Sequence, residues 1–200
     1  YSAPDSVPAF ESKAPVPRGP SQRPVLEFER VHERVHQVGG TIAKDFGKMV
    51  FKGEVVYAVD RPFNVTTPTD ADGLVELDTL DYVLGFNFSY LNDSNLNLQV
   101  FQRIYTEFDD DIAVPATDEV ESGFSVFYRT GALHPRIEPE VLFIGSLNRT
   151  DWLLQAKLTW DVATDWRLAA GVDVFNGPDN GLFGRFDDAD RVFTEVRFSF

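Results

Sequence analysis

Apolar residues recur at every second position over most of this chain, from about residue 35 to the C-terminus. In an α-helix, apolar residues recur three and four positions apart, whereas successive side chains of a β-strand point to opposite faces. The spacing therefore predicts strands that have one apolar and one polar face. The clearest run of apolar positions is Trp152, Leu154, Ala156, Leu158, Trp160 and Val162.

Turn-forming sequences separate the alternating segments and set the expected strand boundaries. The short connections are Gly47-Lys48, Asn92-Asp93-Ser94-Asn95, His134-Pro135 and Ala163-Thr164-Asp165. They take turns with longer polar loops at about residues 64–78, 109–121 and 177–190, with the brief Asn148-Arg149-Thr150 as an exception. We therefore expect an all-β antiparallel meander of about nine strands, at 35–46, 49–60, 79–91, 96–107, 122–133, 137–147, 152–162, 166–175 and 191–200.

The N-terminal segment has a different character. Residues 1–24 hold six of the twelve prolines and few apolar residues. We expect this segment to be an exposed loop or linker that forms neither a ladder nor a core, with residues 25–200 as the folded part. Because the chain opens on Tyr1 and shows no signal-peptide pattern, we expect a processed chain, a fragment or a truncated chain.

Composition excludes several classes of function. The absence of cysteine excludes a disulfide scaffold, a thiolate zinc site and a cysteine nucleophile. The 32 acidic residues against 18 basic ones argue against a nucleic-acid partner. No cofactor is expected. No apolar run approaches the length of a transmembrane helix, but transmembrane strands remain possible because their hydropathy averages to near zero.

Two arrangements place such strands in a stable protein. In a soluble sandwich or lipocalin-like barrel, the apolar face points inward and the polar face meets water. In a transmembrane barrel, the apolar face meets lipid and the polar face lines a lumen. Strands of about 10–12 residues, the regular change between short turns and long loops, and aromatic residues at strand ends favour the transmembrane barrel. These aromatic residues are Trp152, Trp160, Trp166, Tyr82, Tyr90, Phe198 and Phe200.

The last segment, Val192-x-Thr194-x-Val196-x-Phe198-x-Phe200, resembles the terminal strand of Gram-negative outer-membrane barrels. The resemblance implies that Val196, Phe198 and Phe200 form a signal for the barrel-assembly machinery, and that the chain resides in the bacterial outer membrane. Residues 47–57 and 181–192 further resemble a family of large proteobacterial outer-membrane barrels of unknown function. Since members of that family are expected to run to several hundred residues, this chain would be a C-terminal part of such a barrel.

The expected strand number supports an incomplete barrel. Single-chain bacterial barrels have an even number of strands, and nine is odd. Either a further strand lies within residues 25–34, or strands come from a further segment or a companion chain. We favour the second, because an open edge is not tolerated in lipid.

If the polar face points inward, residues of both charges line the lumen. This mixture suits passive passage of small or hydrophobic solutes through a porin-like channel or transporter, although many of these groups are also expected to pair with each other or with a plug. The expected lumen-lining residues are Lys52, Glu54, Asp81, Asn87, Arg103, Arg129, Arg136, Glu138, Glu140, Lys157, Asp161, Arg167, Asp173, Glu195 and Arg197.

One motif supports a rival function. His32-Glu33-Arg34-Val35-His36 matches H-E-x-x-H, in which a helix presents two zinc-binding histidines and a general base. Ile42 stands where the metzincin extension needs a third histidine, and Gly39-Gly40 interrupts the helix that the motif requires. We therefore expect no enzyme, and keep as alternatives a zinc metallopeptidase and a barrel with a structural or docking role in an envelope complex.

Overall fold

The computed structural model describes residues 2–4, 9–16, 25–31, 34–65, 74–90, 93–108, 112 and 118–200. The described chain consists of strands and one short 3-10 helix, η1 (Gly184–Ala189). No helix among these residues is long and apolar enough to cross a lipid bilayer. The fold is all-β, as the period-two pattern predicts.

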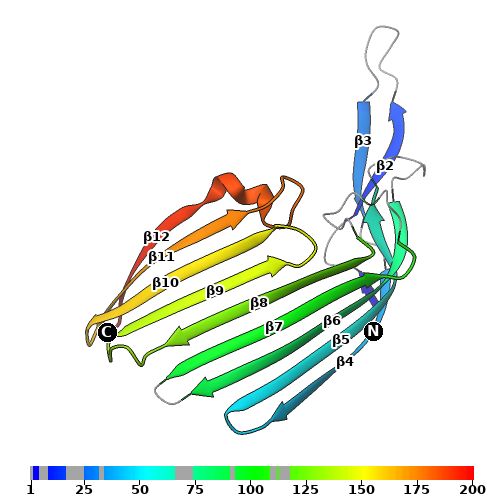
Figure 1. Cartoon of the computed structure of the whole chain (residues 1–200). Coiled ribbons are helices and arrows are strands. Elements are labelled where there is room, and N and C mark those ends of the chain that lie inside the picture. Colours follow the sequence, from blue (N-terminus) through cyan, green and yellow to red (C-terminus); the bar gives the residue numbers. More distant parts are fainter. Residues whose placement is uncertain are drawn as a thin grey trace. The chain divides into compact units, whose positions relative to one another are not determined.

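All nine predicted strands are present. They form one sheet in which each strand is hydrogen-bonded to the next in chain order (Figure 1). The order runs from β1 at one end to β12 at the other, so the described sheet is an antiparallel meander that does not close on itself. The nine strands are β4 (Arg34–Asp45), β5 (Met49–Asn64), β6 (Leu74–Tyr90), β7 (Ser94–Tyr105), β8 (Val120–Thr130), β9 (Ile137–Ser146), β10 (Trp152–Ala163), β11 (Trp166–Asn176) and β12 (Arg191–Phe198).

Strands also occur in the N-terminal segment, where the sequence predicts no ladder, and that expectation is wrong. β1 (Ser2–Pro4) pairs with the start of β4, and β2 (Ala9–Val16) pairs with β3 (Val25–Val31) in a separate hairpin. Proline is tolerated at edges and bulges, where no N–H is needed, and Pro15 lies where the register shifts between Lys13 and Val16. The strand considered within residues 25–34 therefore exists as β3, but it pairs with β2 and leaves the meander open.

The chain divides into two compact units, which we describe separately. Unit 1 comprises Tyr1–Gly40, Val55–Asp81 and Arg103–Glu121. Its core is Phe63, Leu77, Tyr105 and Ile112, with Val75 and Phe108 packed against them. Burial of Phe63 and Leu77 explains why β5 and β6 extend beyond their predicted boundaries. The backbone of Asp60, at a φ of 56°, interrupts the regular strand geometry of β5. The alternation in the sequence therefore does not continue across this residue, and the extension could not be predicted from it.

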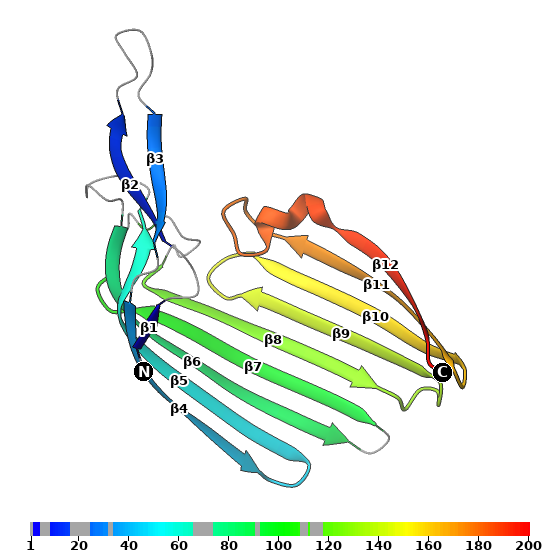
Figure 2. The same ribbon diagram turned by 180° about the vertical axis from the view of Figure 1, so that it is seen from behind.

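Unit 2 comprises Thr41–Glu54, Tyr82–Gln102 and Ser122–Phe200. Within it, β8 to β12 lie side by side, seen from opposite sides in Figures 1 and 2. The turns at 131–136 and 164–165 lie at the same end as the C-terminus, and the Ser199 N–H donates to the carbonyl of Asp165. Residues 147–151 and 177–190 connect the strands at the other end.

The registers of unit 2 divide its side chains between two faces, because residues paired across antiparallel strands point to the same side. We call the face that contains Lys157, Glu140 and Asp173 the polar face. The opposite, apolar face contains Tyr128, Val141, Phe143, Leu154, Leu158, Trp160, Leu168, Val172, Val192, Val196 and Phe198.

Candidate functional site

The polar face of unit 2 carries a series of charge pairs between neighbouring strands. The Lys157 Nζ lies 3.7 Å from a carboxylate oxygen of Glu140, its partner in the register. The Arg129 Nε lies 3.9 Å from Glu138. These pairs join β8, β9 and β10, so the alternation that builds the strands also places opposite charges side by side.

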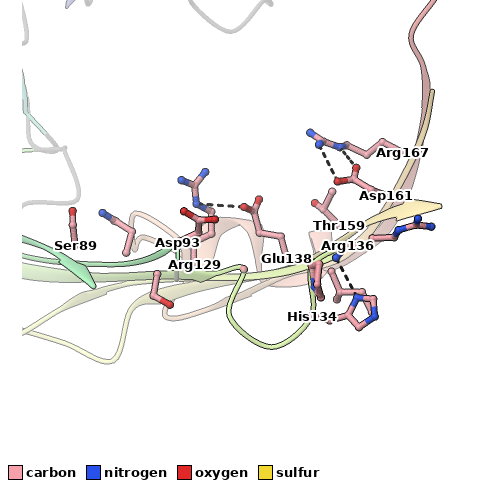
Figure 3. A pocket seen from close by; sticks show the side chains of 14 residues that line it. Ser89, Asp93, Arg129, His134, Arg136, Glu138, Thr159, Asp161 and Arg167 are labelled. Atoms are coloured by element: carbon pink, nitrogen blue, oxygen red, sulfur yellow. Dashed lines mark hydrogen bonds and ion pairs between the residues drawn. The ribbon is translucent and has the colours of Figure 1, made fainter. Parts of the chain in front are cut away.

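A pocket of about 940 Å³ lies where this face meets the turns of unit 2 (Figure 3). Arg129, Arg136 and Arg167 line it together with the carboxylates of Asp93, Glu138 and Asp161. Figure 3 shows Arg129, Glu138, Asp161 and Arg167 on one side of the ribbon, whereas the His134 ring points to the other side. The three arginines and the three carboxylates of the lining balance in charge, so the pocket presents binding groups to both anions and cations.

The most regular ion pair of this pocket is that of Arg167 with Asp161. The Arg167 Nε donates to one carboxylate oxygen of Asp161 at 2.6 Å, and the Arg167 Nη2 donates to the other oxygen at 3.3 Å. The two residues are partners in the β10–β11 register, one position from a bulge at Asp161/Ala163. Planar guanidinium and carboxylate groups match in this two-bond geometry, which fixes both side chains at the turn end of the sheet.

Asp173 is the buried acid of the polar face, with a side chain only 3% exposed. It accepts hydrogen bonds from Gln155 Nε2 at 3.0 Å and from Arg191 Nε at 2.5 Å. Both donors are its partners in the registers of β10 and β12. A second hollow, of about 280 Å³, lies beside it and is lined by Phe127, Leu142 and Phe193 as well as charged groups. Apolar side chains therefore lie among the charged groups of the polar face. None of the residues predicted to line a lumen is apolar.

Contacts of three glycines show which residues of β5, β6 and β7 lie on the polar face and which lie on the apolar face. A Cβ added at Gly123 would meet the Phe101 ring, and one at Gly85 would meet Gln99, which places the odd-numbered residues of β6 and β7 on the polar face. A Cβ at Gly53 would meet Leu84, so Gly53 points to the apolar face. Within unit 2, the thirteen residues predicted to line a lumen accordingly share the polar face, Lys52, Glu54 and Asn87 among them. The other two predicted residues, Asp81 and Arg103, belong to unit 1.

Within unit 1, Arg103 and Asp81 form another two-bond pair, at 2.5 and 2.8 Å, and Arg61 lies 3.8 Å from the same carboxylate.

In unit 2, Arg136 continues the polar face at the start of β9, where its carbonyl accepts the Asp161 N–H. Arg197 and Glu195 form a further ion pair, at 2.9 Å, along β12 on the polar face. Whether this face lines a lumen stays a prediction.

Asp151 is a structurally important residue that sequence reasoning missed. Its buried carboxylate accepts the N–H groups of Leu182, Phe183 and Gly184 at 2.7, 2.9 and 2.9 Å. Gly177 and Gly181 lie against the same carboxylate, where any Cβ would collide with it. The Asp151 carboxylate therefore holds Leu182, Phe183 and Gly184, which belong to the Gly181–Val192 stretch of the resemblance, to the β9–β10 connection. Two glycines spaced four apart after β11 were the available signal.

The H-E-x-x-H motif does not form a described metal site. His32 and Glu33 lie outside the described residues, and His36 is an exposed residue of strand β4, opposite Ser2. Arg34 to His36 is strand, whereas the zinc motif requires a helix. Among the described residues, no three His, Asp or Glu side chains are grouped so that they could hold a metal ion.

The residues of the predicted assembly signal lie at the open end of the sheet. Val196 and Phe198 belong to β12, which pairs only with β11 in the described sheet, and both are exposed. Phe200 follows the strand and is also exposed. Their recognition by an assembly machinery stays a prediction.

Comparisons with protein-family models, with curated proteins and with solved structures find no match for this chain.

Proposed function

We propose that this chain forms part of an outer-membrane β-barrel whose apolar face meets lipid and whose polar face lines a water-filled lumen. The barrel is a porin-like channel or transporter for small or hydrophobic solutes. The charge pairs of the polar face hold the wall of the lumen, and strands outside the described sheet complete it.

One observation carries the proposal: within the described part of the chain, large side chains of the apolar face of unit 2 are exposed. Trp160 is 46% exposed, Leu158 48% and Phe198 51%, and all three point to this face. Full burial of a large apolar side chain contributes about 1.5–3 kcal/mol, so a half-exposed one forgoes roughly half of that free energy. The same face exposes about a dozen such side chains, a cost too large for a water-facing surface of this size. Acyl chains remove that cost.

The position of the aromatic side chains supports the same orientation. Trp166 and Phe198 lie 4.9 Å apart between ring centres, and Phe198 lies 6.3 Å from Phe200, all at the turn end of unit 2. Aromatic residues form girdles at the two rims of a transmembrane barrel, where their rings contact the headgroup region. The connection 177–190 at the other end is also much longer than the turn at 164–165, a difference that fits the two rims of such a barrel.

Single-channel recording in planar bilayers tests the transport function. The intact protein, purified in detergent with any chain that accompanies it, is expected to produce stepwise currents on insertion. Insertion without current at any voltage would contradict a channel and favour the structural or docking barrel, for which the apolar side chains Phe127, Leu142 and Phe193 on the polar face provide a physical basis.

A further inference from the structure

The pairing of β1 with β4 has a direction that leads along an uncovered edge. Ser2 pairs with His36, Ala3 with Val35 and Pro4 with Arg34 (Figure 2). Because the two strands are antiparallel, a strand continued from Ser2 in the N-terminal direction would run beside β4 toward Asp45. The pairing of β1 thus points along β4 rather than away from it.

This edge of β4 presents backbone groups that β5 does not use. In the β4–β5 hairpin, the Phe46 N–H donates to the Met49 carbonyl at 2.8 Å. Since such bonds alternate along an antiparallel pair, the even-numbered residues of β4 bond to β5, and the N–H and C=O groups of Gly39, Thr41 and Ala43 point to the other side. The position of Pro4 agrees with this alternation. Pro4 has no N–H to donate, and it lies opposite Arg34, an even-numbered residue whose backbone groups point away from β1.

The edge is also exposed. Among the described residues, no strand pairs with β4 between Val38 and Asp45 on the side away from β5. Val38 is 69% exposed and Ile42 62%. A long edge with apolar side chains and unused backbone groups is a template for the addition of a further strand.

The direction of the strands fits the same addition. In a meander of nine antiparallel strands, the first and the last run in the same direction, so β4 and β12 cannot pair with each other in the antiparallel sense. One strand added beside β4 runs opposite to both. It therefore gives the even number that a closed antiparallel barrel requires.

We infer that the edge of β4 from Val38 to Asp45 binds an extended strand joined to the N-terminal side of β1, in the register that Ser2 and His36 set. The strand has alternating apolar and polar residues, so that its apolar side chains extend the face that carries Val38 and Ile42. The inference rests on the proposed function, for which it supplies the tenth strand.

Disulfide cross-linking tests this register without background, because the chain contains no cysteine. The chain is extended ahead of Tyr1 by eight residues of alternating valine and threonine, one for each position from Val38 to Asp45. Ile42→Cys is combined with a cysteine at the fifth added residue, counted back from Tyr1, which the register places opposite it. This pair has no hydrogen bonds between its own backbones, and its Cα separation of about 4.5 Å suits a disulfide.

The matched control moves the added cysteine by one residue, which turns its side chain to the other face. We expect oxidation in detergent to give an intramolecular disulfide in the matched chain and at least tenfold less in the shifted chain, measured by intact mass and gel mobility. Equal yields in both chains, or none in either, would contradict the inference. Disulfide-linked dimers as the main product would contradict it in favour of a second copy at this edge. The cross-link does not depend on conduction, so cross-linking without current would contradict only the channel.

Discussion

Asp151 shows how much of this structure depends on a single side chain. Three successive N–H groups donate to its buried carboxylate, and hydrogen bonds to a charged group each contribute about 1.5–3 kcal/mol. In Asp151→Asn, one oxygen becomes an amide donor that faces these N–H groups. We expect amide exchange at Leu182, Phe183 and Gly184 to become about tenfold to a hundredfold faster, measured by NMR in detergent micelles.

Asp188→Asn is the control, because Asp188 is an exposed acid of η1 in the same loop. Its substitution is expected to leave the exchange rates of the three amides unchanged. Equal protection in Asp151→Asn and the parent would show that the loop is held by other contacts.

The Arg191–Asp173 pair permits a second test at this scale, because the two partners differ in burial. Removing the guanidinium in Arg191→Met leaves the buried Asp173 carboxylate, among the described residues, with the Gln155 amide as its side-chain donor. We expect a loss of about 1.5–3 kcal/mol in the free energy of unfolding, measured by urea denaturation in detergent. Arg197→Met, which removes an exposed pair on the same strand, is expected to change little. A larger effect of Arg197→Met would refute this ranking.

The residues of the polar face could be predicted from sequence, whereas Asp151 could not. Alternation fixes which side of a strand a residue occupies, and this was sufficient to place Lys157, Asp161 and Arg167 together. The partners of Asp151 are backbone groups 31 to 33 residues away, and no side-chain pattern encodes them. Alternation also places Phe193 on the polar face, but the predicted lumen lining contains charged residues and Asn87 and so leaves its apolar side chains out.

At the scale of strands, the sequence predicts the nine members of the meander and most of their ends. The prediction failed where tertiary contacts outweigh local pattern. Phe63 and Leu77 extend β5 and β6 because they are buried in the core of unit 1, and β1 and β2 form despite their prolines. The order of the strands followed from the short turns, but the partner of β1 could not follow from any local signal.

Gly171 tests the packing between β10, β11 and β12. It lies opposite Phe193, and a Cβ at this position would lie 2.5 Å from the Phe193 ring and 2.8 Å from the Ala156 carbonyl oxygen. In Gly171→Ala, the ring and the neighbouring strand must shift, which we expect to destabilise the fold by about 1–3 kcal/mol. Urea denaturation in detergent measures the change.

Gly40→Ala serves as the comparison, because a Cβ at Gly40 meets nothing within 4 Å. This substitution is expected to be neutral or slightly stabilising, since alanine restricts the unfolded chain more than glycine does. If the two variants were equally stable, Phe193 would not be packed over Gly171.

At the scale of the whole molecule, the balance of charge on the polar face predicts weak ion selectivity. Of the fifteen residues predicted to line the lumen, seven are basic, seven are acidic and one is Asn87. We expect a permeability ratio of potassium to chloride near that of bulk solution, measured from reversal potentials in a salt gradient. Arg136→Glu removes a positive charge from the turn-end pocket and should shift the ratio toward potassium.

Arg185→Glu makes the same change of charge in η1, away from this pocket, and should shift the ratio less. A strongly selective parent channel, or equal shifts in the two variants, would show that the polar face does not set the ion path.

The orientation of the apolar face is tested most directly by the fluorescence of Trp160 in liposomes that contain brominated phosphatidylcholine. One variant carries Trp152→Phe and Trp166→Phe, so that Trp160 is its single tryptophan. A second variant adds Trp160→Phe and Thr159→Trp to these two substitutions, which moves the single indole to the opposite face. We predict strong quenching of Trp160 by the brominated lipid and little by aqueous acrylamide, with the reverse for the indole at position 159. Quenching of Trp160 by acrylamide but not by lipid, or a chain that is soluble without detergent and shields Trp160 from both, would contradict a lipid-facing apolar surface.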